Sequence, residues 1–286
     1  MVNPAQLWHV CRFEVLRRLR SVSGIVALVV LVITSSVVGR QLAQAARMLN
    51  EAKSSRDAAA LEMVTELIAG MAGFPLETVR ASLEAHAPPL VGAFAFLMFV
   101  MPLLTLTMGY DQTASDIETR HARFLAFRID RVTLYMGKLL GAWLLVSMIV
   151  ATAAVSMAGY IWVAGGALPE LADFAYLARI VATVSIAALP LLTFLGLLGT
   201  LRGRSRRVVL FTVLWWVAVS LAAAAVRFGL EMELLADVVD SLWPTTGRWS
   251  LILDEGGPWL SSAARVALYS LVVGVLGLLH FRRRDL

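Results

Sequence analysis

Cysteine, histidine and charge are all scarce in this chain. Its 286 residues include one cysteine, Cys11, and four histidines. A single thiol cannot form a disulfide within the chain, and so few scattered His and Cys residues offer no zinc-ligand spacing. Charged residues make up 16% of the sequence, against about 25% in soluble domains. These deficits exclude a disulfide-rich secreted domain and a zinc module, and they argue against a soluble fold.

Common nucleotide-binding and hydrolytic motifs are also missing. There is no Gly-x-x-x-x-Gly-Lys-Ser/Thr, so the chain cannot cradle nucleotide phosphates with that loop. Neither His-Glu-x-x-His nor Gly-x-Ser-x-Gly occurs. The neighbouring carboxylates Asp254 and Glu255, and Glu231 with Glu233, lie in a turn-rich region, and we interpret them as solvated. We therefore do not expect an enzyme, and we assign no catalytic residue, cofactor or metal to this chain.

Long apolar runs dominate what is present, and 59% of the residues are hydrophobic. A helix needs about 20 mostly apolar residues to cross the hydrocarbon core of a bilayer. Six runs approach or meet that length, and we expect the first to be retained instead of cleaved as a signal peptide. The runs are residues 22–38, 90–108, 139–163, 177–199, 208–226 and 263–281. The prediction is an all-α polytopic membrane protein, with residues 1–286 forming one domain of six transmembrane helices.

Positive charge indicates the orientation. Sixteen of the 25 Lys and Arg residues lie in the N-terminal segment, in the loops after the second and fourth runs, and in the C-terminal segment. Because an excess of Lys and Arg marks the cytoplasmic side, we predict that both termini are cytoplasmic. Nucleic-acid binding is the competing interpretation of a net charge of +5. We do not expect it, because the bases flank spans and do not line one groove.

The N-terminal segment predicts a helix outside the membrane core. Trp8, Cys11, Val15 and Leu19 recur at helical spacing between Pro4 and Arg20. An amphipathic helix of this kind lies in the headgroup plane. The alternative is a plain basic flank with no defined helix.

Two extracytoplasmic loops are long. Residues 39–89 show apolar residues at helical spacing, interrupted at Gly70 and Gly73, which predicts a helical hairpin. This loop is either a solvated spacer or a docking surface for a substrate or an extracytoplasmic protein. Residues 227–265 contain Trp243, Trp249 and Trp259, and indole is favoured at the headgroup level. We predict short helices that dip into the outer leaflet with a bend at Pro244; the alternative is an ordinary interfacial loop.

The cytoplasmic loop 109–137 is the strongest candidate for a partner-binding element. Asp116 and Arg120 are four residues apart and can pair on one helix face. Another face carries Ile117, His121 and Leu125 together with Phe124. A short helix with an apolar ridge between two spans suits a groove on a cytoplasmic partner. The alternative is that the loop's arginines only hold it to anionic lipid.

A family resemblance involves this loop. The segments that carry the resemblance are Ser115-Asp116-Ile117-Glu118-Thr119-Arg120, Arg123-Phe124-Leu125-Ala126-Phe127-Arg128, Leu134-Tyr135-Met136-Gly137-Lys138-Leu139-Leu140 and Phe281-Arg282-Arg283-Arg284-Asp285-Leu286. Together with the six-span layout they resemble ABC-2-type transporter permeases, most closely those related to the permease of nitrous-oxide reductase maturation. The segment His121–Phe124 departs from the family, which commonly has Glu-x-Gly-Thr there.

The resemblance implies a permease subunit in the cytoplasmic membrane of a prokaryote. Two copies of the chain, as a homodimer, or two related chains would pair in the lipid bilayer. A separate ATPase subunit, carrying ATP and Mg, would dock on a coupling helix and drive export. The implied coupling residues are Asp116, Ile117, Glu118, Arg120, Arg123, Phe124, Leu125 and Phe127. The implied extracytoplasmic gate residues are Trp243, Pro244, Trp249 and Trp259. The alternative is a mechanotransmission subunit, which passes ATPase motion to an extracytoplasmic protein without transporting a solute; a polytopic membrane enzyme is a third class.

Overall fold

The computed structural model describes most of the chain. The described residues are 3–55, 65–66, 76–77, 80, 83, 87–119, 121, 125, 128–165, 169–229, 235, 238–239, 242–244, 251 and 257–284. The helices of this part of the chain include α1 (Pro4–Leu19), α2 (Val22–Ser55), α5 (Pro88–Gly109), α6 (Ala114–Glu118), α8 (Arg131–Gly165), α9 (Leu171–Arg202), α10 (Ser205–Gly229) and α13 (Gly257–Arg283).

Six of these helices are long and apolar enough to cross a membrane, within the part of the chain that is described. They are α2, α5, α8, α9, α10 and α13, and each contains one of the predicted apolar runs. No strand occurs among the described residues. The prediction of an all-α polytopic membrane protein is therefore confirmed.

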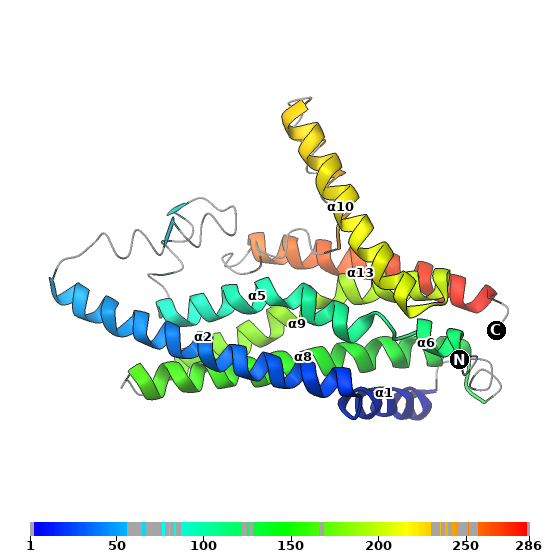
Figure 1. The fold of residues 1–286 in the computed structure, drawn as a ribbon, viewed down its shortest axis with the longest axis horizontal. Helices are drawn as coiled ribbons and strands as arrows, with labels where there is room; N and C mark the ends of the chain where they lie inside the picture. Colours follow the sequence, from blue (N-terminus) through cyan, green and yellow to red (C-terminus); the bar gives the residue numbers. More distant parts are fainter. Residues whose placement is uncertain are drawn as a thin grey trace.

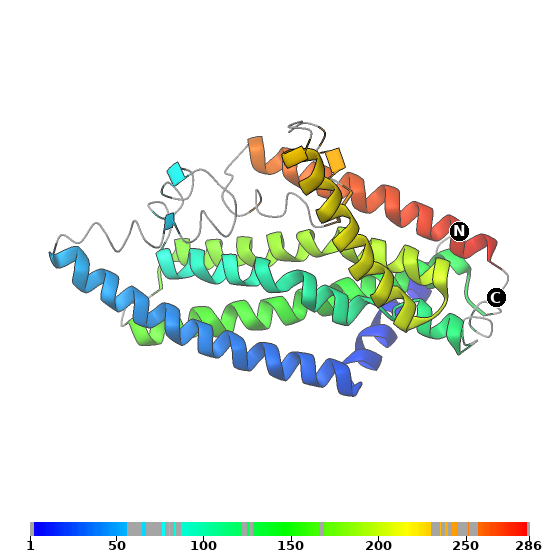
Figure 2. The ribbon, with the colours of Figure 1, turned by 45° about the horizontal axis from the view of Figure 1, so that its top comes forward.

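The bundle is organised around α9, which packs against α5, α8, α10 and α13. On the other side of α8 lie α1 and α2. Both chain ends lie at the same end of the molecule, close to α6 (Figures 1 and 2). This arrangement agrees with an even number of spans. One helix, α10, diverges from the others and projects away from the bundle (Figure 1).

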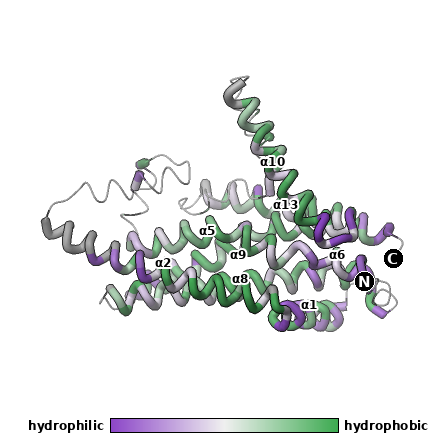
Figure 3. Tube along the Cα trace, viewed as in Figure 1, coloured by the Kyte–Doolittle hydropathy of each residue, from purple (hydrophilic) through white to green (hydrophobic). Residues whose placement is uncertain are grey.

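The main core lies between α5, α8 and α9. Phe94 of α5 meets Tyr176 of α9 edge-on at 6.2 Å, and both side chains are buried. Hydrophobic residues fill the middle of the helices, and hydrophilic residues gather at the end that holds α1, α6 and both termini (Figure 3). This is the end that holds the termini and the loops that we predicted to be cytoplasmic.

Two helix starts follow directly from local sequence. The Asn3 side chain accepts hydrogen bonds from the backbone N–H groups of Ala5 and Gln6, and Pro4 occupies the first turn of α1. At the start of α9, Glu170 and Asp173 cap each other's backbone N–H groups reciprocally. The predicted N-terminal helix is thus present with nearly its predicted bounds.

The first span continues well beyond its apolar run. Helix α2 has 34 residues, about 51 Å at 1.5 Å per residue, against a hydrocarbon core of about 30 Å. Its last turns, up to Ser55, therefore extend past the membrane on the side opposite the chain ends. The returning half of the predicted hairpin lies mostly outside the described residues.

Candidate functional site

Part of the predicted coupling loop is helical among the described residues: α6, and the single positions His121 and Leu125. Helix α6 spans Ala114–Glu118, and Thr119 ends it. Asp116, Ile117, Glu118 and Leu125 are among the described residues. The other predicted coupling residues, Arg120, Arg123, Phe124 and Phe127, lie outside them, as does the predicted partner of Asp116 at position 120.

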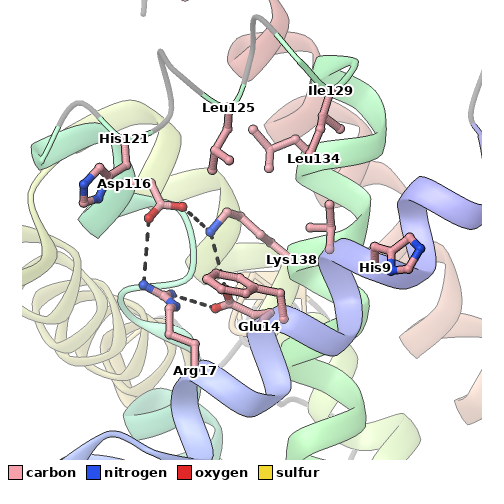
Figure 4. Close-up of a pocket in the computed structure, with 11 residues that line it drawn as sticks. His9, Glu14, Arg17, Asp116, His121, Leu125, Ile129, Leu134 and Lys138 are labelled. Carbon is pink, nitrogen blue, oxygen red and sulfur yellow. Dashed lines mark hydrogen bonds and ion pairs between the residues drawn. The ribbon is translucent and has the colours of Figure 1, made fainter.

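Asp116 belongs to a buried ionic cluster that joins three elements. Its carboxylate pairs with Lys138 of α8 and lies 3.8 Å from the Arg17 guanidinium of α1. Lys138 also reaches the Glu14 carboxylate of α1, at 3.4 Å. Figure 4 shows these four side chains converging. The cluster ties α6 and the start of α8 to the N-terminal helix.

Glu14 is the centre of this ionic cluster and is only 1% exposed. Its Oε1 accepts hydrogen bonds from Arg17 at 2.9 Å and from Arg18 at 2.7 Å. Arg18 in turn lies 2.8 Å from Asp111, just after α5. The ionic cluster thus balances three carboxylates against three cations: Glu14, Asp111, Asp116, Arg17, Arg18 and Lys138. Such balance is what allows charges to be buried.

The environment of the ionic cluster also shifts the pKa values of two groups on α1, Glu14 and Cys11. Burial by itself would raise the pKa of Glu14, but Lys138, Arg18 and Arg17 outweigh it and lower the pKa to about 2. Burial, with a smaller contribution from the Glu14 charge, raises the pKa of the Cys11 thiol. Glu14 is therefore ionised throughout the physiological range, and Cys11 stays a neutral thiol.

Two glycines of α8 allow α1 to sit close against it. A Cβ at Gly137 would lie 2.7 Å from Val10 Cβ, and one at Gly141 would lie 2.8 Å from Glu14 Cβ. A Gly-x-x-x-Gly spacing puts both on one helix face, where backbones can approach closely. Close approach brings Glu14 within reach of Lys138.

Beside the ionic cluster is a cavity of about 690 Å³. Five of its lining side chains are apolar, and they come from α1, the coupling loop and α8. The complete lining is His9, Val10, Phe13, Glu14, Arg17, Asp116, His121, Leu125, Ile129, Leu134 and Lys138. His9, Phe13 and His121 are exposed, so the cavity opens to the surface. His9 and His121 stand on opposite sides of it, with the ion pairs between them (Figure 4).

The other sides of α6 rest on α9 and on the start of α10. Before α6, Gln112 donates to the Leu192 carbonyl at 2.7 Å and Thr113 to the Gly196 carbonyl at 3.3 Å. At its end, Glu118 Oε2 accepts a hydrogen bond from the Ser205 backbone N–H at 3.2 Å. Helix α6 therefore contacts α9 and α10, and its Asp116 lines the cavity.

Arginines cap the helix ends near α6. Arg131 donates to the carbonyls of Arg282, at 2.7 Å, and Arg284, at 3.0 Å, where α13 ends. Arg284 donates to the Thr200 carbonyl near the end of α9. Cations at helix C-termini satisfy free carbonyls and oppose the helix dipole favourably.

The predicted gate residues do not all lie together. Trp243 is half-buried and meets Phe194 of α9 at 6.5 Å and Trp216 of α10 at 6.4 Å, while Pro244 beside it is buried. Trp259 is at the start of α13 and packs against the main core. Trp249 lies outside the described residues.

Sequence reasoning missed Glu14, Arg18 and Lys138 as site residues. It treated the basic residues as flanks and looked for apolar spacing on α1. A buried stripe at positions 10, 11, 14 and 18 does have helical spacing, but it contains two charges. The Gly137 and Gly141 pair was the signal available in the sequence for a close-packed α8 face. Among the described residues no group of three or more His, Cys, Asp or Glu could hold a metal ion.

Comparison with models of known protein families finds no match, and comparison with curated proteins finds none either.

Proposed function

We propose that the chain is the membrane-spanning permease subunit of an ABC transporter, driven by a separate ATPase subunit. The cavity between α1, the coupling loop and α8 is the proposed docking site for that subunit. Two observations support the proposal. The coupling loop resembles that of ABC-2-type permeases, and Asp116 of α6 lines the cavity. The proposal assigns ATP hydrolysis to the partner and movement to this chain.

The observation that carries the proposal is the ionic cluster beneath the cavity. Pairs such as Glu14 with Lys138 are buried, and removing one partner of a buried pair is strongly unfavourable. Helices α1, α6 and α8 therefore move together when force is applied at the cavity. An apolar cavity on a rigid base suits the transmission of motion from a docked protein.

The proposal includes an orientation. The end with α6 and both termini faces the cytoplasm, in a prokaryotic cytoplasmic membrane, and two copies of the chain form the transport unit. Thr119 after α6 and Leu171 at the start of α9 are both exposed. A cysteine at Leu171 should react with an impermeant thiol reagent in intact cells, and one at Thr119 should not. The reverse pattern would contradict this orientation.

Leu125→Asp tests the docking site. Leu125 lines the cavity and is half-buried, so a carboxylate there would be desolvated by a docked partner. We expect at least about a thirtyfold loss of affinity, the size of an interface hot spot. The measurement is copurification of the ATPase subunit from the native host, with Mg-ATP hydrolysis by the purified complex.

His280→Asp is the matched control, because His280 is exposed at the same end of the molecule but does not line the cavity. The control complex should keep its ATPase subunit and its hydrolysis rate. Normal copurification and hydrolysis with Leu125→Asp would overturn the docking site. A wild-type chain that never brings an ATPase with it would overturn the proposed function.

A mechanotransmission role is the second candidate, and the length of α2 favours it. The α2 residues beyond Gln44, the end of its apolar segment, form a rigid extension on the extracytoplasmic side. Such an extension can act on an extracytoplasmic protein even if no solute crosses the bilayer. Reconstituted complexes distinguish the two roles: transport predicts ATPase stimulation by a solute, and mechanotransmission predicts stimulation by a secreted protein partner.

A further inference from the structure

Helix α10 is the least supported of the spans in this bundle. It packs against α9 and α6 and then leaves the bundle (Figure 1). Large apolar side chains remain exposed along it, including Leu214, Trp216 and Leu221. Among the described residues, few contacts resist a change in the angle of α10, so its position depends on the contacts at two fixed points.

The first fixed point is the turn between α9 and α10. Gly203 has φ +63°, a left-handed conformation that favours glycine, and it ends α9. A Cβ there would lie 3.0 Å from Cγ2 of Ile117, so α6 is in contact with the turn. Two residues later, Glu118 of α6 accepts the Ser205 N–H at 3.2 Å. A carboxylate at a helix N-terminus satisfies a free donor and opposes the helix dipole favourably.

The second fixed point lies part-way along α10. The Leu242 carbonyl accepts hydrogen bonds from Trp215 of α10 at 3.4 Å and from Tyr269 of α13 at 3.5 Å. Next to it, Trp243 meets Phe194 edge-on and Trp216 at a tilt of 41°. The segment 242–244 is thus inserted between α9, α10 and α13.

This inserted segment lies well along the bundle axis, although the Leu242 side chain itself is exposed. Phe194 lies eight residues before the α9 end at Arg202, about 12 Å along the helix axis. The segment therefore reaches the half of the bundle nearer α6. Irregular backbone at that depth has to be satisfied by protein, as the two donors to Leu242 do.

We infer that α6 sets the angle of α10 through Glu118 and Ile117, and that α10 transmits this angle to the segment 242–244. A displacement of α6 moves the cap on Ser205 and rotates α10 about Gly203. The rotation changes the gap in which Trp243 is held. The two groups of residues singled out by the sequence, on α6 and around Trp243, are thereby joined by one helix. The inference rests on the proposed function for the source of the movement, but the control of the angle requires no partner.

Spin labels test the control of the angle in the chain alone. Ala182 of α9 and Ala222 of α10 are both exposed, at comparable distances from the turn. Cysteines at these positions carry the labels, and the full chain is placed in lipid nanodiscs. Pulsed electron paramagnetic resonance then gives the distribution of distances between α9 and α10. The same labelling reaction on the chain without the added cysteines shows how much label the buried Cys11 takes up.

Glu118→Ala should broaden that distribution, because it removes the cap that holds α10. Loss of an N-cap should raise the population of displaced α10 positions by roughly fivefold. Glu118→Gln keeps an acceptor for the Ser205 N–H and should broaden the distribution less. Glu170→Ala is the matched control: it removes a glutamate cap from α9 at the opposite end and should leave the α9–α10 distances unchanged. An unchanged distribution with Glu118→Ala would overturn the inference.

Adding the ATPase partner separates this inference from the proposed function. In the complex with Mg-ATP, the wild-type α9–α10 distance should shift. In the complexes that Glu118→Ala forms at saturating ATPase, at least half of that shift should be lost. A complex that assembles and hydrolyses ATP without moving α10 would overturn the inference and leave the proposed function standing. If no complex with an ATPase forms, but Glu118→Ala broadens the distance distribution of the single chain, the proposed function is overturned and the inference about α10 stands.

Discussion

Helices α1 and α10 both lie at the edge of the bundle, yet they are held in opposite ways. Helix α1 has 16 residues, many of them polar, and its inner face is locked by buried ion pairs. Helix α10 has 25 residues and an apolar sequence, and most of its surface is exposed. The polar helix is the fixed one, and the apolar helix is the one that diverges.

This difference shows what positions a helix beside a membrane bundle. Lipid tails are as apolar as leucine side chains, so an apolar helix gains little by leaving lipid for protein. Ion pairs such as Glu14 with Lys138 have no equivalent in lipid, and close approach at Gly141 adds packing that only one arrangement provides. Substitutions in α1 should therefore have larger effects than substitutions in α10.

Removing the central charge of α1 should have the largest effect. Glu14→Ala removes the carboxylate that Lys138 and Arg18 share and leaves each with one acidic partner, Asp116 or Asp111. Breaking buried pairs of this kind costs about 3–5 kcal/mol. We expect a lower melting temperature in detergent and detachment of α1 from α8. Detachment exposes Cys11, which is 3% exposed in the intact protein, so its reaction with a maleimide measures the position of α1.

Arg12→Ala is the control on the same helix, because Arg12 is exposed. It should change neither the melting temperature nor the reactivity of Cys11. Slow labelling in Glu14→Ala, equal to that of the wild type, would show that the ionic cluster does not hold α1.

Lowering the pH should reproduce part of the destabilisation expected for Glu14→Ala. The pKa of Glu14 is lowered from its ordinary 4.5 to about 2 in the folded protein. A carboxyl with a lowered pKa stabilises the fold above its unfolded pKa, and the contribution disappears as pH falls through the folded value. About 3 kcal/mol should therefore be lost between about pH 4.5 and pH 2. Melting curves across this range should show the loss in the wild type and a smaller one in Glu14→Gln; equal slopes would contradict it.

Filling the glycine contact should have an intermediate effect. A Cβ at Gly141 would lie 2.9 Å from the Cys11 carbonyl oxygen, so α1 would have to shift. Overpacking of this kind costs about 1–3 kcal/mol. Gly141→Ala should lower the melting temperature and increase Cys11 labelling, and unchanged values would show that α1 has room to move. Gly159→Ala is the control on the same helix, because a Cβ there meets nothing within 4 Å.

The smallest effect is expected on α10. Ala222 is exposed, and Ala222→Leu adds apolar surface to a helix that already meets lipid. The melting temperature should move little, since surface substitutions of this kind change stability by about 0.5 kcal/mol or less. A strong destabilisation of the purified single chain would mean that α10 has a tightly packed neighbour, and the contrast with α1 would fail.

Sequence reasoning predicted the membrane-spanning elements well because each is a local property. A run such as Val208–Val226 is apolar along its whole length and needs no partner to be recognised, and α10 contains it. The start of α1 was equally local, since Asn3 and Pro4 are adjacent to the turn they cap. The bounds of these elements follow from neighbouring residues.

The candidate site depends on contacts between distant residues, which the sequence does not reveal. Glu14 and Lys138 are 124 positions apart, and their pairing requires α1 to turn back against α8. Glu118 and Ser205 are 87 positions apart, and no pattern in either segment indicates the other. The sequence indicated which loop carries α6, but its partners became visible only once the helices were packed.

The capped helix ends around α6 have a consequence for binding. Free carbonyls and N–H groups at a helix end normally keep bound water, and a protein that covers them has to displace it. Here Arg131 bonds the last carbonyls of α13, Arg284 bonds a carbonyl of α9, and Glu118 bonds a donor of α10. A partner that binds at this end therefore meets backbone groups that are already hydrogen-bonded within the chain, and its binding has a smaller desolvation cost.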